Sequence, residues 1–263
     1  MHPIRVGAQL HPQHGDYVDL RRAAIEAEQL GYDAVFNWDH FFPLYGGGDR
    51  HLECWTVLAA WAEATERIEL GPLVTCNSYR NPNLLADMAR TVDRISAGRL
   101  VLGLGAGWFR RDYDEYGYEF GTAPDRLRDL RQALPRIKDR IGKLNPPPVG
   151  RLPILIGGSG PQVTLKLVAQ YGDMWHAFGD ADAYKAKNEI LLAHCRDVGR
   201  DETEIERTWA IQAGNLDNAD ALVEAGVTHL IVGVGGDGSG YDLTPLQELV
   251  AWRDAYVRQH TLT

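Results

Sequence analysis

Cysteine is scarce in this 263-residue sequence, and its placement excludes several classes of protein. Cys54, Cys76 and Cys195 are odd in number, lie far apart and show no paired spacing. This excludes a disulfide framework and a cysteine zinc site, and it is typical of a reducing compartment. The sequence also lacks an apolar run of about 18 residues, and its start lacks a signal-like apolar stretch. We therefore expect a cytoplasmic protein without a membrane partner.

Basic residues are fewer than acidic ones. The chain has 27 Lys and Arg against 36 Asp and Glu, which gives a formal net charge of −9. Such a balance repels polyphosphate backbones, so we expect no nucleic-acid partner. Apolar residues make up 44% of the chain and charged residues 24%, which are ordinary fractions for a globular protein. Disorder and fibrous repeats are therefore not expected.

Several motifs of well-known enzyme classes are missing. The sequence has no Gly-Lys-Ser/Thr and therefore no P-loop, and it has no Gly-x-Ser-x-Gly nucleophile elbow. The glycines of residues 103–107 are spaced G-x-G-x-G on the fourth predicted strand, which is a poor match to a Rossmann dehydrogenase. A metal site at His11, His14, Asp39 and His40 is disfavoured because their spacing matches no usual ligand pair. We therefore expect no metal.

Eight short apolar, β-rich runs are present instead, with helical patterns between them. Most of the runs are continuously apolar, the pattern of parallel strands covered by helices. Dividing 263 by eight gives about 33 residues, close to one strand–helix unit. Without any dividing linker, this predicts a single (β/α)8 TIM barrel domain over residues 1–263, with an open doubly wound sheet as the competing fold. The predicted strands are Ile4–Gln9, Ala34–Asp39, Ile68–Thr75, Arg99–Ala106, Ile154–Ser159, Asp173–Gly179, Glu206–Ala213 and His229–Gly235.

The clearest helical pattern follows the third predicted strand. Apolar residues recur at helical spacing from Asn83 to Ile95, with Asn81 as the N-cap and Gly98 as the stop. A longer helix is predicted over Pro124–Leu144. Only a short turn is predicted near Tyr113–Gly117.

The candidate site residues stand at the carboxyl ends of the predicted strands, where the loops of a barrel converge on one mouth. Gly157, Gly158, Ser159 and Gly160 are the best phosphate-site candidates, because a helical pattern over Gln162–Tyr171 follows them and helix N-termini attract anions. The alternative interpretation is a tight turn between strand and helix. The other glycine-rich strand ends are Gly103–Gly107 and Gly233–Gly236.

Polar and aromatic residues stand at the same predicted strand ends. Asp39 and His40 end the second strand, and Thr75, Cys76 and Asn77 end the third. Histidine is a common general acid or base, although a histidine in a loop is also often only structural. Cys76 has no recognisable base beside it, so a nucleophilic role is disfavoured.

The chain resembles the bacterial luciferase-like flavin and deazaflavin oxidoreductases, in particular the members that depend on coenzyme F-420. The resemblance covers nearly the whole chain and depends on several segments in the expected order. These segments are Gly31–His40, Leu52–Leu58, Thr65–Gly71, Val74–Asn77, Tyr79–Pro82, Ser96–Leu100, Gly103–Trp108 and Pro153–Pro161.

The resemblance implies a barrel that holds the cofactor ring in its mouth, with a non-proline cis peptide within Val74–Cys76. It implies that His40 is the catalytic proton-transfer residue. The implied cofactor-binding residues are Asp39, Val74, Thr75, Cys76, Asn77, Gly105, Ala106, Gly107, Gly157, Gly158, Ser159 and Gly160. Weaker candidates for the substrate pocket are His11, Glu53, Trp108 and Trp175.

The implied function is an F-420-dependent oxidoreductase that transfers a hydride between the deazaflavin and a small organic substrate. One alternative is an FMN-dependent luciferase-like monooxygenase that receives reduced flavin from a partner reductase. A second alternative is a non-catalytic carrier or sensor of flavin or deazaflavin. Related sugar-phosphate dehydrogenases have an acidic residue where this chain has Trp108, which argues against a sugar substrate. The resemblance also makes a homodimer an expectation.

Overall fold

The computed structural model describes residues 4–214 and 216–261, in which strands and helices alternate. Its strands are β1 (Arg5–His11), β2 (Ala34–Asn37), β3 (Glu69–Pro72), β4 (Thr75–Cys76), β5 (Leu102–Gly105), β6 (Ile154–Gly157), β7 (Met174–Phe178), β8 (Glu206–Ile211) and β9 (His229–Gly235). Its α-helices are α1 (Tyr17–Gln29), α2 (Cys54–Ala64), α3 (Pro82–Ile95), α4 (Arg110–Tyr116), α5 (Ala123–Ile141), α6 (Thr164–Tyr171), α7 (Ala181–Val198), α8 (Ala219–Ala225) and α9 (Thr244–Thr261). Short 3-10 turns lie at Asn77–Tyr79 (η1) and Glu202–Glu204 (η2).

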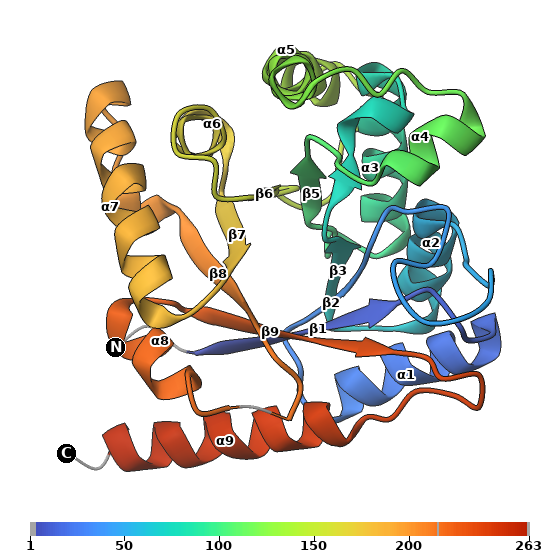
Figure 1. The fold of residues 1–263 in the computed structure, drawn as a ribbon, viewed down its shortest axis with the longest axis vertical. Coiled ribbons are helices and arrows are strands. Elements are labelled where there is room, and N and C mark those ends of the chain that lie inside the picture. Colours follow the sequence, from blue (N-terminus) through green and yellow to red (C-terminus); the bar gives the residue numbers. More distant parts are fainter. Residues whose placement is uncertain (1–3, 215, 262–263) are drawn as a thin grey trace.

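The strands pair in parallel around a ring, with the helices outside them (Figure 1). The order is β3-β2-β1-β9-β8-β7-β6-β5-β4. An isolated parallel bridge between Leu70 and Leu100 joins the β3 end of this order to the segment that leads into β5. The predicted (β/α)8 barrel is therefore confirmed, with β3 and β4 together forming its third strand.

The third strand is interrupted by a cis peptide bond between Leu73 and Val74. The prediction placed this bond within Val74–Cys76 and was wrong by one residue. The sequence could not identify the bond because cis peptides are strongly associated with proline, and this segment has none between the two short strands. Val74 lies beside two glycines, since an added Cβ would lie 2.5 Å from Val74 Cγ2 at Gly105 and 2.9 Å from Val74 Cγ1 at Gly157.

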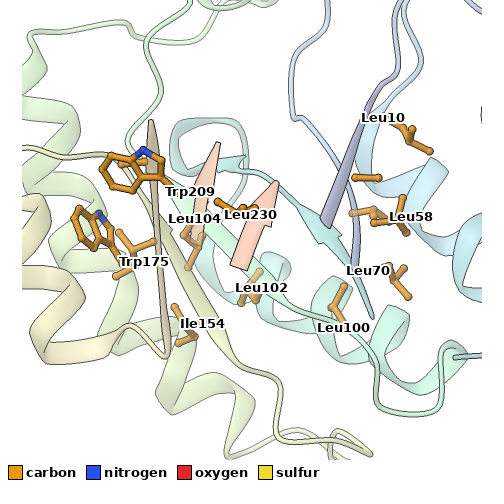
Figure 2. Packing of buried hydrophobic residues seen from close by; sticks show 14 of the residues in the cluster. Leu10, Leu58, Leu70, Leu100, Leu102, Leu104, Ile154, Trp175, Trp209 and Leu230 are labelled. Carbon is orange, nitrogen blue, oxygen red and sulfur yellow. The ribbon is translucent and has the colours of Figure 1, made fainter. Parts of the chain in front are cut away.

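Buried apolar side chains from several strands and helices fill the spaces between the layers (Figure 2). Trp175 of β7 and Trp209 of β8 meet edge to face, with ring centroids 5.4 Å apart. Each indole also donates a hydrogen bond to a loop carbonyl, from Trp175 Nε1 to Gly158 at 2.9 Å and from Trp209 Nε1 to Gly179 at 2.8 Å. These two tryptophans therefore tie the loops after β6 and β7 to the core.

The helices differ from the predictions mainly at their ends. A full helix, α4, replaces the short turn that was predicted near Tyr113–Gly117. Helix α5 begins at Ala123, because Thr122 and Asp125 form a reciprocal capping box, and it ends at Ile141 before the predicted Leu144. Helix α6 begins at Thr164, two residues after the predicted start. Among the described residues, no helix has the length and apolar character needed to cross a bilayer.

Candidate functional site

A cavity of about 180 Å³ lies at the carboxyl ends of β2, β4 and β5. This is the end of a parallel barrel where the loops converge and where such folds bind small molecules. Seven predicted site residues line the cavity, namely Asp39, His40, Val74, Thr75, Cys76, Gly107 and Trp108. Trp38, Leu44, Leu73 and Tyr79 line it as well.

His40 is held by a buried carboxylate that the sequence analysis did not select. Its Nδ1 lies 2.7 Å from Oδ2 of Asp112, a fully buried residue of α4. Asp112 also accepts hydrogen bonds from the backbone N–H of Phe41 at 3.0 Å and from the hydroxyl of Tyr79 at 2.9 Å. No described residue hydrogen-bonds to the other ring nitrogen of His40, Nε2. This nitrogen is therefore the one available to a ligand.

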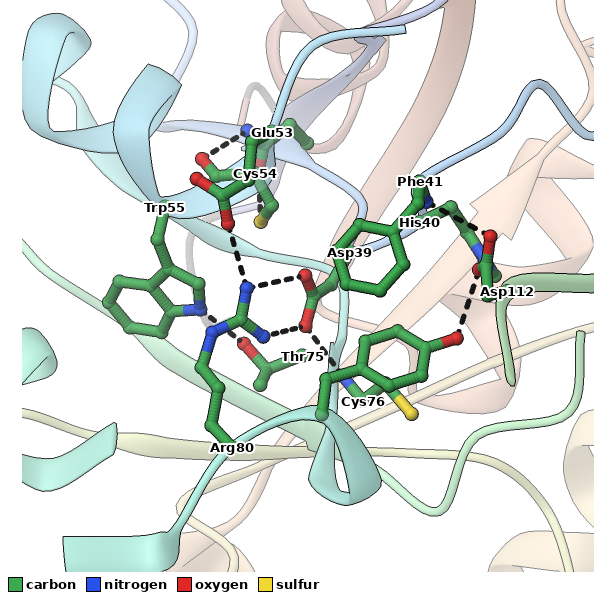
Figure 3. Close-up of polar contacts among 12 residues, drawn as sticks. Asp39, His40, Phe41, Glu53, Cys54, Trp55, Thr75, Cys76, Arg80 and Asp112 are labelled. Atoms are coloured by element: carbon green, nitrogen blue, oxygen red, sulfur yellow. Dashed lines mark hydrogen bonds and ion pairs between the residues drawn. The ribbon is translucent and has the colours of Figure 1, made fainter. Parts of the chain in front are cut away.

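Asp39 lies next to His40 in the chain but in a different environment. Its side chain is 1% exposed, and it forms two contacts with the guanidinium of Arg80, at 2.5 and 3.0 Å (Figure 3). Oδ2 also accepts the backbone N–H of Cys76 at 3.0 Å, which fixes the end of β4. Burial raises the pKa of Asp39, and Arg80 opposes that shift.

Arg80 is shared between two carboxylates. Its Nη2 also lies 2.7 Å from Oε1 of Glu53, which caps α2 by accepting the N–H of Thr56 at 2.7 Å. Burial alone would lower the pKa of Arg80, but Asp39 and Glu53 raise it overall. Glu53 therefore caps helix α2 and forms an ion pair with Arg80. It does not line the cavity.

Cys76 lines the cavity and contacts Tyr113, which does not line it. Cys76 Sγ lies 3.2 Å from the hydroxyl of Tyr113, which in turn donates to Ser78 Oγ at 3.0 Å. Burial raises the pKa of Cys76, so its thiol stays protonated at neutral pH. Gly107 has φ of 81°, and a Cβ there would lie 2.5 Å from Cys76 Sγ. Glycine is required at this position by both its backbone conformation and its close neighbours.

Aromatic rings form one side of the mouth. Trp108 is 63% exposed, and its ring centroid lies 5.8 Å from that of His40. Trp38 stacks on His11 at 4.0 Å, and His11 contacts the hydroxyl of Tyr45 through Nδ1. Burial lowers the pKa of His11 to about 4, so this imidazole is neutral at physiological pH. The rings near His40 are thus largely uncharged.

The remaining predicted residues lie outside the cavity. Gly157 ends β6, and Gly158, Ser159 and Gly160 lie in the partly exposed loop that leads to α6. Gly105 packs against Val74, and Ala106 precedes Gly107. The Oδ1 atom of Asn77 is buried without a hydrogen-bond partner. Trp175 is fully buried beside Trp209 and Tyr184, so the structure does not bring it to the mouth.

The strands, the outer helices and the cavity at the carboxyl strand ends define a barrel of the kind that binds a small molecule at its mouth. The chain belongs to the luciferase-like monooxygenase family, whose model matches residues 1–244.

Two of the similar proteins carry names of different kinds. The chain is 27% identical over 187 residues to an F-420-dependent glucose-6-phosphate dehydrogenase of Amycolatopsis mediterranei, covering 65% of this chain and 56% of that protein. It is 28% identical over 243 residues to the pyrimidine monooxygenase RutA of Agrobacterium fabrum, covering 81% of this chain and 65% of that one. The chain spans about half the length of the first curated relatives it matches.

A solved structure supports the fold assignment. An F-420-dependent secondary alcohol dehydrogenase in complex with an F-420–acetone adduct matches with a TM-score of 0.82 and 18% identity. The match covers 95% of this chain and 98% of that one, so the two share the whole barrel.

Proposed function

We propose that the protein is an F-420-dependent oxidoreductase that transfers a hydride between the deazaflavin and a small organic substrate. The observation that carries the proposal is His40, whose Nδ1 is held by Asp112 while Nε2 has no partner among the described residues. Relatives whose names state dependence on F-420 support the choice of cofactor.

Two parts of the site fit such a cofactor. Residues 74–76, Gly107 and Trp108 line the cavity and would contact its ring. Gly157 at the end of β6 and the partly exposed loop of Gly158, Ser159 and Gly160 precede α6, whose N-cap residue Val163 makes no side-chain hydrogen bond. The N–H of Leu165 already donates to the carbonyl of Gly160 at 3.0 Å, and the other N–H groups of that first turn would hold a phosphate. When bound, F-420 supplies the hydride chemistry, and the chain supplies binding, orientation and a proton site.

The proton site is His40. An ionised Asp112 can only accept hydrogen bonds, so the proton shared with His40 lies on Nδ1. In the neutral ring, Nε2 then keeps its lone pair and can take a proton from a substrate oxygen. Asp112 is itself fixed by Phe41 and Tyr79, so the ring orientation is set before a ligand binds.

An FMN-dependent monooxygenase is the second candidate, because a relative named as a monooxygenase matches 81% of the chain and a solved monooxygenase of similar fold is in complex with FMN. A carrier or sensor agrees less well with the site, since binding alone does not require a histidine held by a buried carboxylate. Both alternatives use the same barrel mouth. They differ in cofactor preference and in turnover.

The test is to titrate purified protein separately with F-420 and with FMN, following cofactor absorbance and tryptophan fluorescence. We expect F-420 to bind and to exchange hydride with at least one member of a substrate panel. Tight FMN binding without F-420 binding would overturn the cofactor assignment. Binding without exchange across a broad panel would instead favour the carrier.

A matched pair of variants tests the phosphate loop. Ser159→Asp places a negative charge in the loop and is expected to weaken F-420 binding by about tenfold or more, because like charges repel in a partly desolvated site. Ser159→Ala at the same position adds no charge and should bind nearly as the unmodified protein does. Equal binding by both variants would exclude this loop as the phosphate site.

A further inference from the structure

A second histidine faces the mouth of the barrel from β7. Met174, His176 and Phe178 alternate along this strand and therefore point to the same side. Trp175 between them packs in the core against Tyr184 of α7, which places the other three side chains on the inner face of the barrel. Exposure rises along that face, from buried Met174 through partly exposed His176 to Phe178, which is 79% exposed. His176 is therefore open on the side of the carboxyl-terminal mouth.

The hydrogen bonds of Thr208 determine which nitrogen of His176 carries the proton. The hydroxyl of Thr208 donates to the backbone carbonyl of Trp175 at 3.1 Å, and it has only one proton to donate. Its oxygen also lies 2.9 Å from Nδ1 of His176, so Nδ1 is the donor in that contact. Burial, with a smaller effect of His229, lowers the pKa of His176 to about 3, so the ring is neutral at physiological pH. Nε2 therefore keeps its lone pair, and no residue in the described part of the chain donates a hydrogen bond to it.

Another histidine of the inner face, His229 of β9, lies in a different environment. It is fully buried, and among the described residues neither of its ring nitrogens has a hydrogen-bond partner. Its Nδ1 lies 3.4 Å from Oε1 of Glu206, a residue that lines a cavity at the amino-terminal end of the barrel. His229 is thus closed off from the mouth, and of these two histidines His176 is the one that a ligand in the mouth can reach.

Gly157 and Val74 connect His176 with the cavity beside His40. Gly157 is paired in register with His176, and neighbouring strands lie about 4.8 Å apart. A Cβ at Gly157 would lie 2.9 Å from Cγ1 of Val74, which lines the cavity. Because Gly157 has no side chain, β6 places no side chain of its own between Val74 and His176 at this level. A system of three fused rings that lies on Val74 beside His40 therefore extends over Gly157 to His176.

We propose that His176 contacts the ring of the bound cofactor, with its Nε2 accepting a hydrogen bond from an N–H or O–H group at the edge of that ring. This rests on the proposed function for the presence of such a ring, and it holds for F-420 and for FMN alike. Both rings carry an N–H group, and the deazaflavin also carries a hydroxyl. An ionised ring oxygen is disfavoured here, because it would face a lone pair instead of a proton. His40 and His176 then have separate tasks, one in proton transfer and one in orienting the ring.

The first test observes Nε2 directly, by nitrogen-15 NMR of protein labelled at histidine, with and without oxidised F-420 and, separately, FMN. The signals that disappear in His176→Gln identify this residue. We expect the free protein to show a neutral ring with its proton on Nδ1 over about pH 5–8. On binding of the cofactor, the Nε2 signal should move towards that of a protonated nitrogen. A shift with both cofactors identifies the N–H as the donor, and a shift with F-420 alone identifies the hydroxyl.

The outcomes separate this inference from the proposed function. An unmoved Nε2 signal in protein saturated with F-420 would overturn the inference and leave the proposed function intact. If FMN bound and moved the signal while F-420 did not bind, the proposed function would fail and the inference would stand. Protein that bound neither cofactor would overturn both.

The second test compares two variants of His176 by the dissociation constant for F-420. His176→Leu removes the acceptor and is expected to weaken binding by about tenfold, the loss of one hydrogen bond in a partly desolvated site. His176→Gln retains a side-chain oxygen that can accept, and it should recover most of the affinity. Equal affinity of His176→Leu and the unmodified protein would contradict the contact.

Discussion

The two ends of the barrel use their charges in opposite ways. The amino-terminal end has the larger cavity, about 730 Å³, lined by charged residues that include Arg5, Glu69, Glu206 and Arg207. Arg5 forms ion pairs with both Glu69 and Glu206, so these charges are paired within the protein. At the carboxyl-terminal end, the cavity beside β2, β4 and β5 is smaller, at about 180 Å³, but it presents Nε2 of His40 and an exposed Trp108.

If the proposed function holds, the state of the side chains identifies the site in this molecule better than the size of the cavity does. Charges that are paired across strand starts hold a barrel together, and the amino-terminal end of such folds usually contributes stability. A polar atom that is rigidly oriented and lacks a partner is instead ready for a ligand. Changes at the two ends should therefore separate activity from stability.

The largest effect is expected from His40→Gln at the carboxyl-terminal end. We expect kcat/KM for alcohol oxidation to fall by about 10²- to 10⁴-fold, because the proton of the hydroxyl loses its acceptor. The dissociation constant for F-420 should change little. Alcohol oxidation is the direction to assay, since solvent can supply the proton for a reduction. Unchanged turnover would remove His40 from the mechanism.

A smaller loss of activity is expected from Asp112→Asn, which keeps the size of the side chain and removes its charge. We expect a decrease in kcat/KM of about 10- to 100-fold, comparable with the loss of carboxylates that orient metal-binding histidines. Nitrogen-15 NMR of labelled histidine should show less of the tautomer that carries its proton on Nδ1. Asp112→Glu should recover part of the lost kcat/KM and part of the Nδ1-protonated tautomer. A full loss of activity with an unchanged tautomer would contradict an orienting role.

The smallest effect on activity is expected from Arg5→Met at the amino-terminal end, with kcat/KM within about twofold. The free energy of unfolding should fall by about 1–2 kcal/mol, a value reduced from that of fully buried pairs because these side chains are partly exposed. Urea unfolding measures this change. Arg151→Met in the same cavity removes a more exposed arginine and should cost no more than about 0.5 kcal/mol.

The pH dependence of the Arg5 variant sharpens the test. Burial opposes ionisation of Glu206, but His229 and Arg5 outweigh it and lower the pKa of Glu206 below 4.5. Its contribution to stability is therefore fully present above about pH 4.5 and is lost as the pH falls through the lowered pKa. The difference between Arg5→Met and the unmodified protein should thus shrink in acid. If the difference in the free energy of unfolding stayed constant with pH, the ion pair with Glu206 would not be the contact through which Arg5 stabilises the protein.

The barrel could be predicted from sequence because its signals are local. Continuous apolar runs, helix caps and glycine-rich strand ends each act over a few residues, and they repeat along the chain. The link between His40 and Asp112 spans 72 residues and has no local signal. It depends on α4, which the sequence analysis took for a short turn.

Single side chains were harder to place than strands. Trp175 and His176 are neighbours in β7, and adjacent strand residues point to opposite faces, so composition alone cannot tell which one faces the mouth. Glu53 was selected as a pocket residue, yet its position before an apolar helix is also the signal of an N-cap, and the structure shows it capping α2. Residues at strand ends thus carry folding and binding signals that overlap.

The contact of Val74 with Gly105 and Gly157 has a consequence for how the family evolves. The three residues come from three different strands and share one small volume, so the size allowed at each depends on the other two. Among relatives, we expect a smaller residue at position 74 wherever position 105 or 157 carries a side chain. Two glycines that the sequence suggested as cofactor-binding residues, Gly105 and Gly157, therefore also have a packing role against Val74. We expect substitutions at these three positions to occur together.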